Sequence, residues 1–193
     1  MGAGTAPIVK LLARDCRTNG IKLIACDLKP QVEVYEALEK QYPEKVIAIY
    51  APIDFSKSHK WESSTLLLIV DSFHHIPPKN RLATLASLTR SAERVMIFES
   101  LHNNPLSILL AAFGALFAWV LVPILCFNKP GNMRRILWCW LLPVAPLMFG
   151  WDSIVSCKRM WNDQQWYEAL GKILDGSRIP KVKSTFNTQL VIW

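Results

Sequence analysis

A run of apolar residues ending in a polar cluster stands near the middle of the chain. Residues 65–70 are aliphatic or β-branched without alternation, which favours a strand buried on both faces of a parallel sheet. Asp-Ser-Phe-His-His follows at 71–75, and two prolines at 77–78 cannot continue a strand. Ligands of open α/β sheets bind beyond the carboxyl ends of the strands. This strand end is therefore the first place to look for chemistry.

Shorter apolar patterns on either side predict the remaining regular structure. Helices are expected over 8–16, 31–41, 79–91 and 162–174, and strands over 21–27, 45–50, 94–99, 182–186 and 189–193. Alternating helices and strands imply right-handed crossovers and a parallel sheet. The last two strands are expected to be antiparallel and to finish the sheet. The fold class is α/β and Rossmann-like.

A glycine turn and an acid suggest a nucleotide site near the N-terminus. Gly2 and Gly4 open the first helix, where backbone N–H groups and the helix dipole can approach a polar ligand. Asp27 ends the next strand about 20 residues later, a spacing that suits the two hydroxyls of a ribose. The alternative is a plain helix cap and a solvated aspartate. Asp54 follows the third strand and has two readings, an acceptor for an adenine amine or a turn residue that caps the next segment.

One strand is missing from this pattern. A glycine turn of this kind should follow a buried strand, but Met1 stands where that strand would end. We expect either an N-terminal truncation or a domain that tolerates the loss of its first strand. The loss would expose two strand edges that should be paired.

The composition becomes more apolar after residue 104. Residues 106–127 contain no charged side chain over a length that can span a hydrocarbon core, and 136–151 form a shorter run broken by prolines. A basic turn at 128–135 separates the two runs. A spanning hairpin would place its three cations on the far side, against the positive-inside tendency. We therefore favour a hairpin dipping into one leaflet over a transmembrane helix, with a soluble helical cap over the active site as a third possibility.

Charge and cysteine content narrow the partners. The net charge of +7 fits nucleic acid or an anionic membrane, and the scattered basic residues favour the membrane. Five cysteines show no metal-binding spacing and indicate reduced, packed thiols. We expect a lipid bilayer as a partner, with no nucleic acid and no metal.

Taken together, the motifs resemble a class I S-adenosylmethionine-dependent methyltransferase of a membrane-associated group. The resemblance covers nearly the whole chain and departs from the group at the absent first strand. It rests on Gly2-Ala3-Gly4, Asp27-Leu28-Lys29-Pro30, Phe73-His74-His75, Phe98-Glu99, and the stretch from Pro143 to Arg159 with Trp151-Asp152 and Val155-Ser156.

The resemblance implies a cofactor and a set of site residues. S-adenosylmethionine would be bound by Gly2, Gly4, Asp27, Leu28, Asp54 and Asp71. If the acceptor is a hydroxyl, His74 or His75 could act as the base; the alternative is a structural role, with one histidine hydrogen-bonded under the loop. A zinc pair is disfavoured because adjacent residues at a strand end point apart.

These expectations combine into one functional hypothesis with two alternatives. The protein would methylate a hydrophobic or membrane-associated small molecule, with its catalytic half facing the cytoplasm. Its segments would be a cofactor-binding half over 1–103, an apolar hairpin insertion over 104–151, and a completing helix and strands over 152–193. A catalytically inactive, membrane-anchored remnant acting through partners is the first alternative. A nicotinamide-dependent enzyme is the weakest, because Ala6-Pro7 replaces the third glycine of a dinucleotide loop.

Overall fold

The computed structural model describes two compact units of the chain. The described residues are 6–193 except 16, 18–19, 58–60, 62–64, 126–131, 177 and 186–187. The first unit comprises 1–99, 167–182 and 190–193, and the second comprises 100–166 and 183–189. The predicted Gly2 and Gly4 lie outside the described residues.

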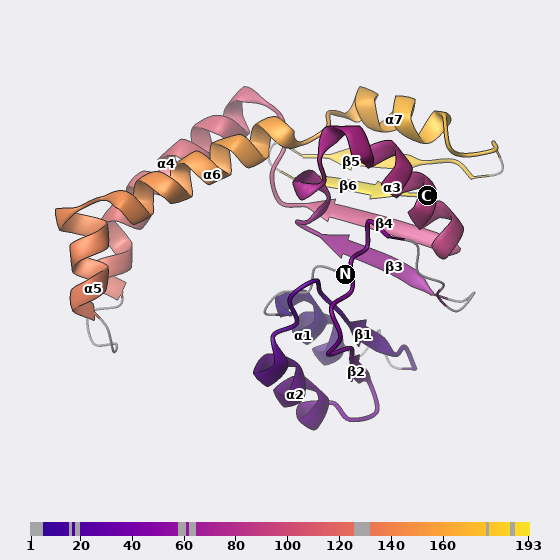
Figure 1. Cartoon of the computed structure of the whole chain (residues 1–193), viewed down its shortest axis with the longest axis horizontal. Coiled ribbons are helices and arrows are strands. Elements are labelled where there is room, and N and C mark those ends of the chain that lie inside the picture. Colours follow the sequence, from indigo (N-terminus) through magenta and orange to yellow (C-terminus); the bar gives the residue numbers. More distant parts are fainter. Residues whose placement is uncertain are drawn as a thin grey trace. The chain divides into compact units, whose positions relative to one another are not determined.

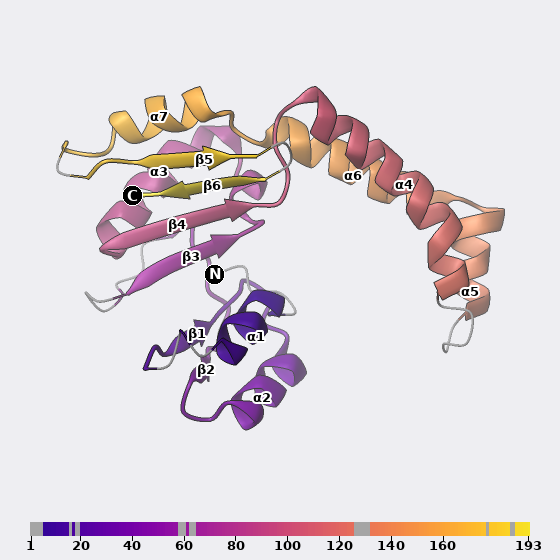
Figure 2. The ribbon, with the colours of Figure 1, turned by 180° about the vertical axis from the view of Figure 1, so that it is seen from behind.

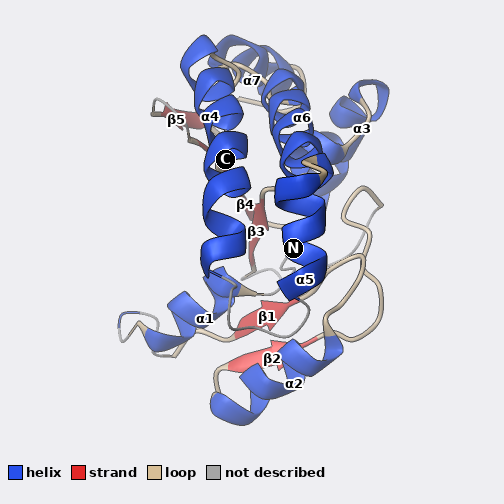
Figure 3. Ribbon diagram, turned by 90° about the vertical axis from the view of Figure 1, so that its left-hand side faces the viewer, coloured by secondary structure: helices blue, strands red, loops and turns tan. Residues whose placement is uncertain are grey.

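The first unit begins with a small α/β layer. Its elements are α1 (Pro7–Arg14), β1 (Leu23–Ala25), α2 (Val32–Gln41) and β2 (Val46–Ala48). β1 and β2 pair in parallel, with the helices beside them (Figure 3). Pro7 suits the first turn of a helix, where its missing N–H is not needed. The core of this layer consists of Ala6, Ala13, Ala25, Tyr35, Leu38 and Val46.

A four-stranded mixed sheet forms the rest of the first unit's framework (Figure 1). Its order is β3 (Leu66–Val70), β4 (Arg94–Glu99), β6 (Gln189–Ile192) and β5 (Lys181–Ser184). β3 and β4 are parallel with Val70 opposite Phe98, so their carboxyl ends are level. Trp193 exchanges both backbone hydrogen bonds with Val95, which makes the last strand antiparallel to β4 as predicted. Helix α3 (Pro78–Ser91) packs against the sheet (Figure 2).

Two expectations about the sheet are corrected. The sequence predicted a single sheet, but in the described residues β1 and β2 form a separate sheet that no strand joins to β3. The prediction that β3 is buried on both faces is also wrong. Leu67 and Ile69 are buried while Leu66 is half exposed, and this alternation along β3 shows that one face of the strand is covered less than the other.

The second unit is built around two helices. They are α4 (Pro105–Leu125) and α6 (Val144–Arg159), which pack side by side (Figure 1). Between them lie α5 (Asn132–Ile136) and a short π-helix, Leu137–Leu141. Helix α7 (Asp163–Gly171) follows α6.

The helices of the described residues do not support a transmembrane helix. None of them is both long and apolar enough to cross a membrane. The second apolar run does not form one continuous helix, because the helical structure is interrupted at Pro143, between the π-helix and α6.

Close packing of α4 and α6 depends on one glycine, and this generates a prediction. A Cβ at Gly150 would lie 2.7 Å from the Cβ of Ala115, whereas one at Gly114 would meet only the ring of Phe149 at 3.6 Å. Both glycines are helical, so alanine should raise helix propensity by about 1 kcal/mol at either position.

We expect Gly150→Ala to be destabilising, because overpacking costs about 1–3 kcal/mol and outweighs the propensity gain. Gly114→Ala should be neutral or stabilising. Thermal unfolding followed by circular dichroism compares the two variants, and equal midpoints would contradict the packing described.

Candidate active site

The chain turns sharply at the end of β3. Asp71 has a φ of 45°, a left-handed conformation that aspartate tolerates better than most residues. Its N–H donates to the carbonyl of Phe98 on β4 (2.9 Å), and Ser72 Oγ donates back to the carbonyl of Val70 (2.7 Å). The turn leads directly into the 3₁₀ helix η2, Phe73–His75. Asp71 and the two histidines are thus held at the carboxyl end of β3.

A buried histidine–glutamate pair fixes this turn to β4. His74 is 6% exposed and Glu99 is 2% exposed. Glu99 Oε2 lies 2.8 Å from His74 Nδ1, and Glu99 Oε1 accepts the backbone N–H of His74 (3.2 Å). With an ionised Glu99 carboxylate, which only accepts hydrogen bonds, Nδ1–H is the donor of this contact. Both carboxylate oxygens are therefore used to hold one residue.

Arg81 of α3 closes the same turn from the other side. Its side chain is buried, with Nε donating to the carbonyl of Ile76 (3.0 Å) and Nη2 to the carbonyl of His74 (3.1 Å). The guanidinium carbon also lies 5.9 Å from the centre of the Phe73 ring. Arg81 of α3 and Glu99 of β4 thus hold the turn from two sides.

The two histidines end in different surroundings. His75 is exposed, and its ring centroid lies 4.1 Å from that of the buried His74. The bonding of His74 matches the structural alternative, with one histidine held under the loop. Their catalytic roles stay a prediction.

Glu99 and Arg81 were not among the predicted site residues. An acid that ends a buried strand was a usable signal for Glu99. Arg81 had none, because an arginine in an amphipathic helix normally faces solvent.

The predicted ribose and adenine ligands follow β1 and β2. Asp27 is half-buried and accepts the N–H of Lys29 on Oδ1 (2.9 Å), while the neighbouring Leu28 is exposed. The backbone carbonyl of Asp27 accepts the N–H of Ile53 (2.8 Å), which brings the loop carrying Asp54 beside Asp27. Asp54 Oδ1 accepts the N–H (3.0 Å) and hydroxyl (2.6 Å) of Ser56, the turn-capping arrangement that the sequence left open.

A buried hydroxyl lies close enough to Asp27 to respond to its charge. Tyr35 is fully buried, and among the described residues its Oη has no hydrogen-bond partner. Burial, and then the negative charge of Asp27, raise the pKa of Tyr35 to about 12. Nearby in the same core, Ala6 begins α1 with a left-handed φ of 55° and no side-chain cap. An orphaned donor, an acid and uncapped helix N–H groups are the kinds of partner that a polar nucleoside needs.

The comparisons with known proteins point to solved structures alone, since no protein-family profile and no curated protein matches. The complex of LepI with SAM has a TM-score of 0.54 at 15% identity, covering 100% of this chain and 41% of that one. The structure of PigF with SAH has a TM-score of 0.56 at 15% identity, covering 99% of this chain and 48% of that one. A possible exported protein from Bordetella parapertussis has a TM-score of 0.57 at 12% identity, covering 99% of this chain and 58% of that one.

The chain has an α/β fold with a mixed sheet that resembles those of solved structures bound to SAM or SAH. It spans between 41% and 58% of the length of these three solved structures. At identities below 25%, the likeness concerns the fold, and the chemistry has to be argued from the residues.

The Glu99–His74 pair generates a stability prediction. Glu99→Ala leaves two buried donors of His74 unpaired, and we expect the free energy of unfolding to fall by about 1–3 kcal/mol for each. Glu99→Gln keeps one acceptor oxygen and should cost clearly less. Chemical denaturation measures both, and an equal loss in the two variants would show that the pairing does not matter.

Proposed function

We propose that this protein uses S-adenosylmethionine to methylate a hydrophobic or membrane-associated small molecule. The observation that carries the proposal is the combination of a methyltransferase-like fold with polar groups at two strand ends. Solved neighbours of the same fold are complexes with SAM or SAH.

The residues beyond β1 fit the nucleoside part of that cofactor. The carboxylate of Asp27 would accept from the ribose hydroxyls, and the orphaned hydroxyl of Tyr35 lies in its electrostatic reach. Leu28 is exposed beside it and would pack on the adenine side. Asp54 would have to give up its bonds to Ser56 to reach an adenine amine. The cofactor supplies a methyl group already activated by its sulfonium, so the protein needs mainly to position the acceptor.

The histidines would divide the remaining work. Because Glu99 holds His74 through Nδ1 and the backbone, His74 serves as a support that orients the turn. His75 is exposed next to it and is the candidate base for a hydroxyl acceptor. Asp71 lies at the level of Glu99 and would line the same strand-end site.

The helices α4 and α6 support the membrane part of the proposal. They carry many exposed large apolar side chains, among them Leu109, Phe113, Phe117, Val120, Leu147, Met148 and Phe149. Four exposed tryptophans, Trp119, Trp138, Trp140 and Trp151, would suit the headgroup level of a bilayer. No acidic residue occurs between 104 and 151, whereas Lys129, Arg134 and Arg135 do. We place this helix pair in one leaflet, with the catalytic half on the cytoplasmic side.

A second candidate is an inactive relative that acts through partners. It is favoured by the division of the strands of the described residues into two sheets, since a cofactor site of this fold normally lies across one continuous sheet.

Binding of S-adenosylhomocysteine separates the two candidates. We expect the detergent-solubilised protein to bind it with micromolar affinity in titration calorimetry, and Asp27→Ala to abolish binding. Glu36→Ala, which removes an exposed acid from α2, serves as the control and should leave affinity unchanged. A folded protein that gives no heat of binding would favour the inactive relative.

Vesicle flotation tests the membrane part by itself. We expect vesicles containing phosphatidylserine to carry the protein, and Phe117→Glu with Leu147→Glu to reduce binding by more than about tenfold, because charges are costly in hydrocarbon. Leu11→Glu changes an equally exposed apolar residue on α1 and should have no effect. Equal flotation of all three proteins would contradict membrane docking by α4 and α6.

A further inference from the structure

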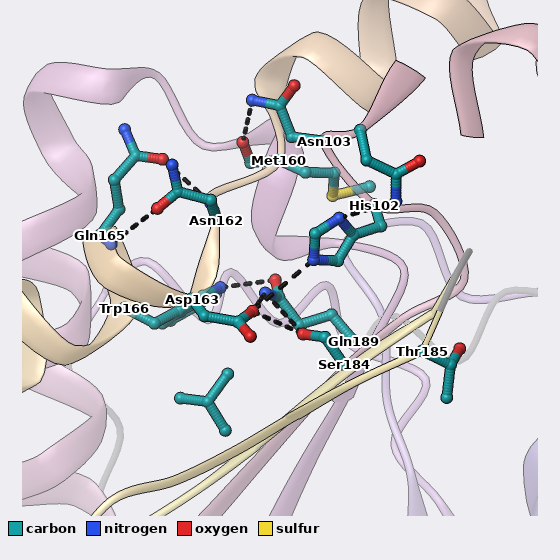
Figure 4. Close-up of polar contacts among 12 residues, drawn as sticks. His102, Asn103, Met160, Asn162, Asp163, Gln165, Trp166, Ser184, Thr185 and Gln189 are labelled. Carbon is teal, nitrogen blue, oxygen red and sulfur yellow. Dashed lines mark hydrogen bonds and ion pairs between the residues drawn. The ribbon is translucent and has the colours of Figure 1, made fainter. Parts of the chain in front are cut away.

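A polar network lies at the start of α7 in the second unit (Figure 4). Asp163 Oδ1 accepts the hydroxyl of Ser184 (2.5 Å) and the side-chain amide of Gln189 (2.8 Å). Gln189 Oε1 in turn accepts the indole N–H of Trp166 (2.7 Å). Gln189 and Trp166 are almost fully buried, so this network is a fixed part of the unit.

His102 faces the same carboxylate without completing a hydrogen bond. Its Nε2 lies 3.6 Å from Asp163 Oδ1 (Figure 4). Within the described part of the chain, this buried nitrogen has no hydrogen-bond partner. The other ring nitrogen, Nδ1, lies 3.1 Å from the side-chain nitrogen of Asn104.

The cap of α4 fixes which way the Asn104 amide points. Asn104 Oδ1 accepts the N–H of Ser107 (2.7 Å), the bond that an N-cap side chain makes to the first turn of a helix. Asn104 Nδ2 must therefore be the group that faces His102, and it can only donate. Nδ1 of His102 is consequently an acceptor, and the neutral ring carries its proton on Nε2, toward Asp163.

Protonation of His102 conflicts with this arrangement. A charged imidazole has two N–H donors, so Nδ1–H would face the N–H groups of Asn104. Half a turn of the amide would relieve the conflict by presenting Oδ1 to the ring. The same rotation would place Nδ2 against the N–H of Ser107 and break the cap.

We propose that His102 is a proton-sensitive switch on the start of α4, in which a charged ring and the Asn104 cap exclude each other. The groups facing the ring come from several elements. Asp163 of α7 is charged, Asn104 is neutral, and Ser184 and Gln189 reach Asp163 from β5 and β6. Asn103 is directed elsewhere, since its amide donates to the carbonyl of Met160 (3.2 Å).

The negative charge of Asp163 favours the protonated form of the His102 imidazole between pH 5.5 and pH 8, the range of the test below. Burial alone would raise the pKa of Asp163, but the hydrogen bonds from Ser184 and Gln189, together with the facing His102 ring, more than offset it and hold that pKa below its usual value. The carboxylate therefore stays ionised over the neutral to mildly acidic range. Acid should charge His102, draw it toward Asp163 and release the cap.

Amide hydrogen exchange of the full chain in detergent tests this switch. We expect protection of the Ser107 amide to fall about fivefold between pH 8 and pH 5.5, after correction for intrinsic exchange, as for a lost N-cap. Gln165 is a matched internal control. Its backbone N–H donates to Asn162 Oδ1 (2.9 Å) in a reciprocal capping box at the start of α7 that involves no histidine.

Two variants decide the mechanism. Asn104→Asp offers acceptors to both Ser107 and a charged ring, so its Ser107 protection should not change with pH. His102→Gln should likewise remove the pH dependence. Unchanged Ser107 protection in the wild type, the same loss in His102→Gln, or ¹⁵N shifts showing the Nδ1-protonated tautomer at pH 8 would each overturn the proposal.

Discussion

The candidate site at the end of β3 depends on the buried carboxylate of Glu99, which holds His74 in place. Burying Glu99 at the end of β4 is favourable only if both of its oxygens find donors, and His74 provides both. The chain turns immediately after β3, where Asp71 takes a left-handed conformation, and this turn brings His74 to Glu99. Arg81 then saturates the carbonyls that the turn leaves unpaired. The exposure of His75 follows, because its neighbour occupies the buried side.

Much of the secondary structure could be predicted because its causes are local. The strand at 94–99 coincides with β4, and the helix expected over 31–41 differs from α2 by one residue. The antiparallel end of the sheet was also foreseen from two short segments. What failed depends on partners distant in sequence. Whether β3 is buried on both faces is decided by the elements that pack over each face, and the run 65–70 carries no information about them.

The site was foreseen less completely than the fold, and for a related reason. Strand-end acids and histidines are visible as breaks in an apolar pattern, so Asp27, Asp71 and His74 could be selected. Tyr35 could not, because its sequence position indicates only an apolar face of α2. Its interest arises from an unsatisfied hydroxyl and a charge contributed by another element. Arg81 was hidden in the same way, by a helix position that normally faces solvent.

Ala6 fixes the start of α1 to the core in a way that glycine would not. Its left-handed backbone costs about 1–2 kcal/mol for a residue with a Cβ, and glycine would avoid that cost. Its methyl group, however, is buried among Ala13, Tyr35 and Leu38. The start of α1 is thereby anchored to the same side chains that support α2. Any displacement of Ala6 would therefore disturb packing that is shared by both helices of this layer.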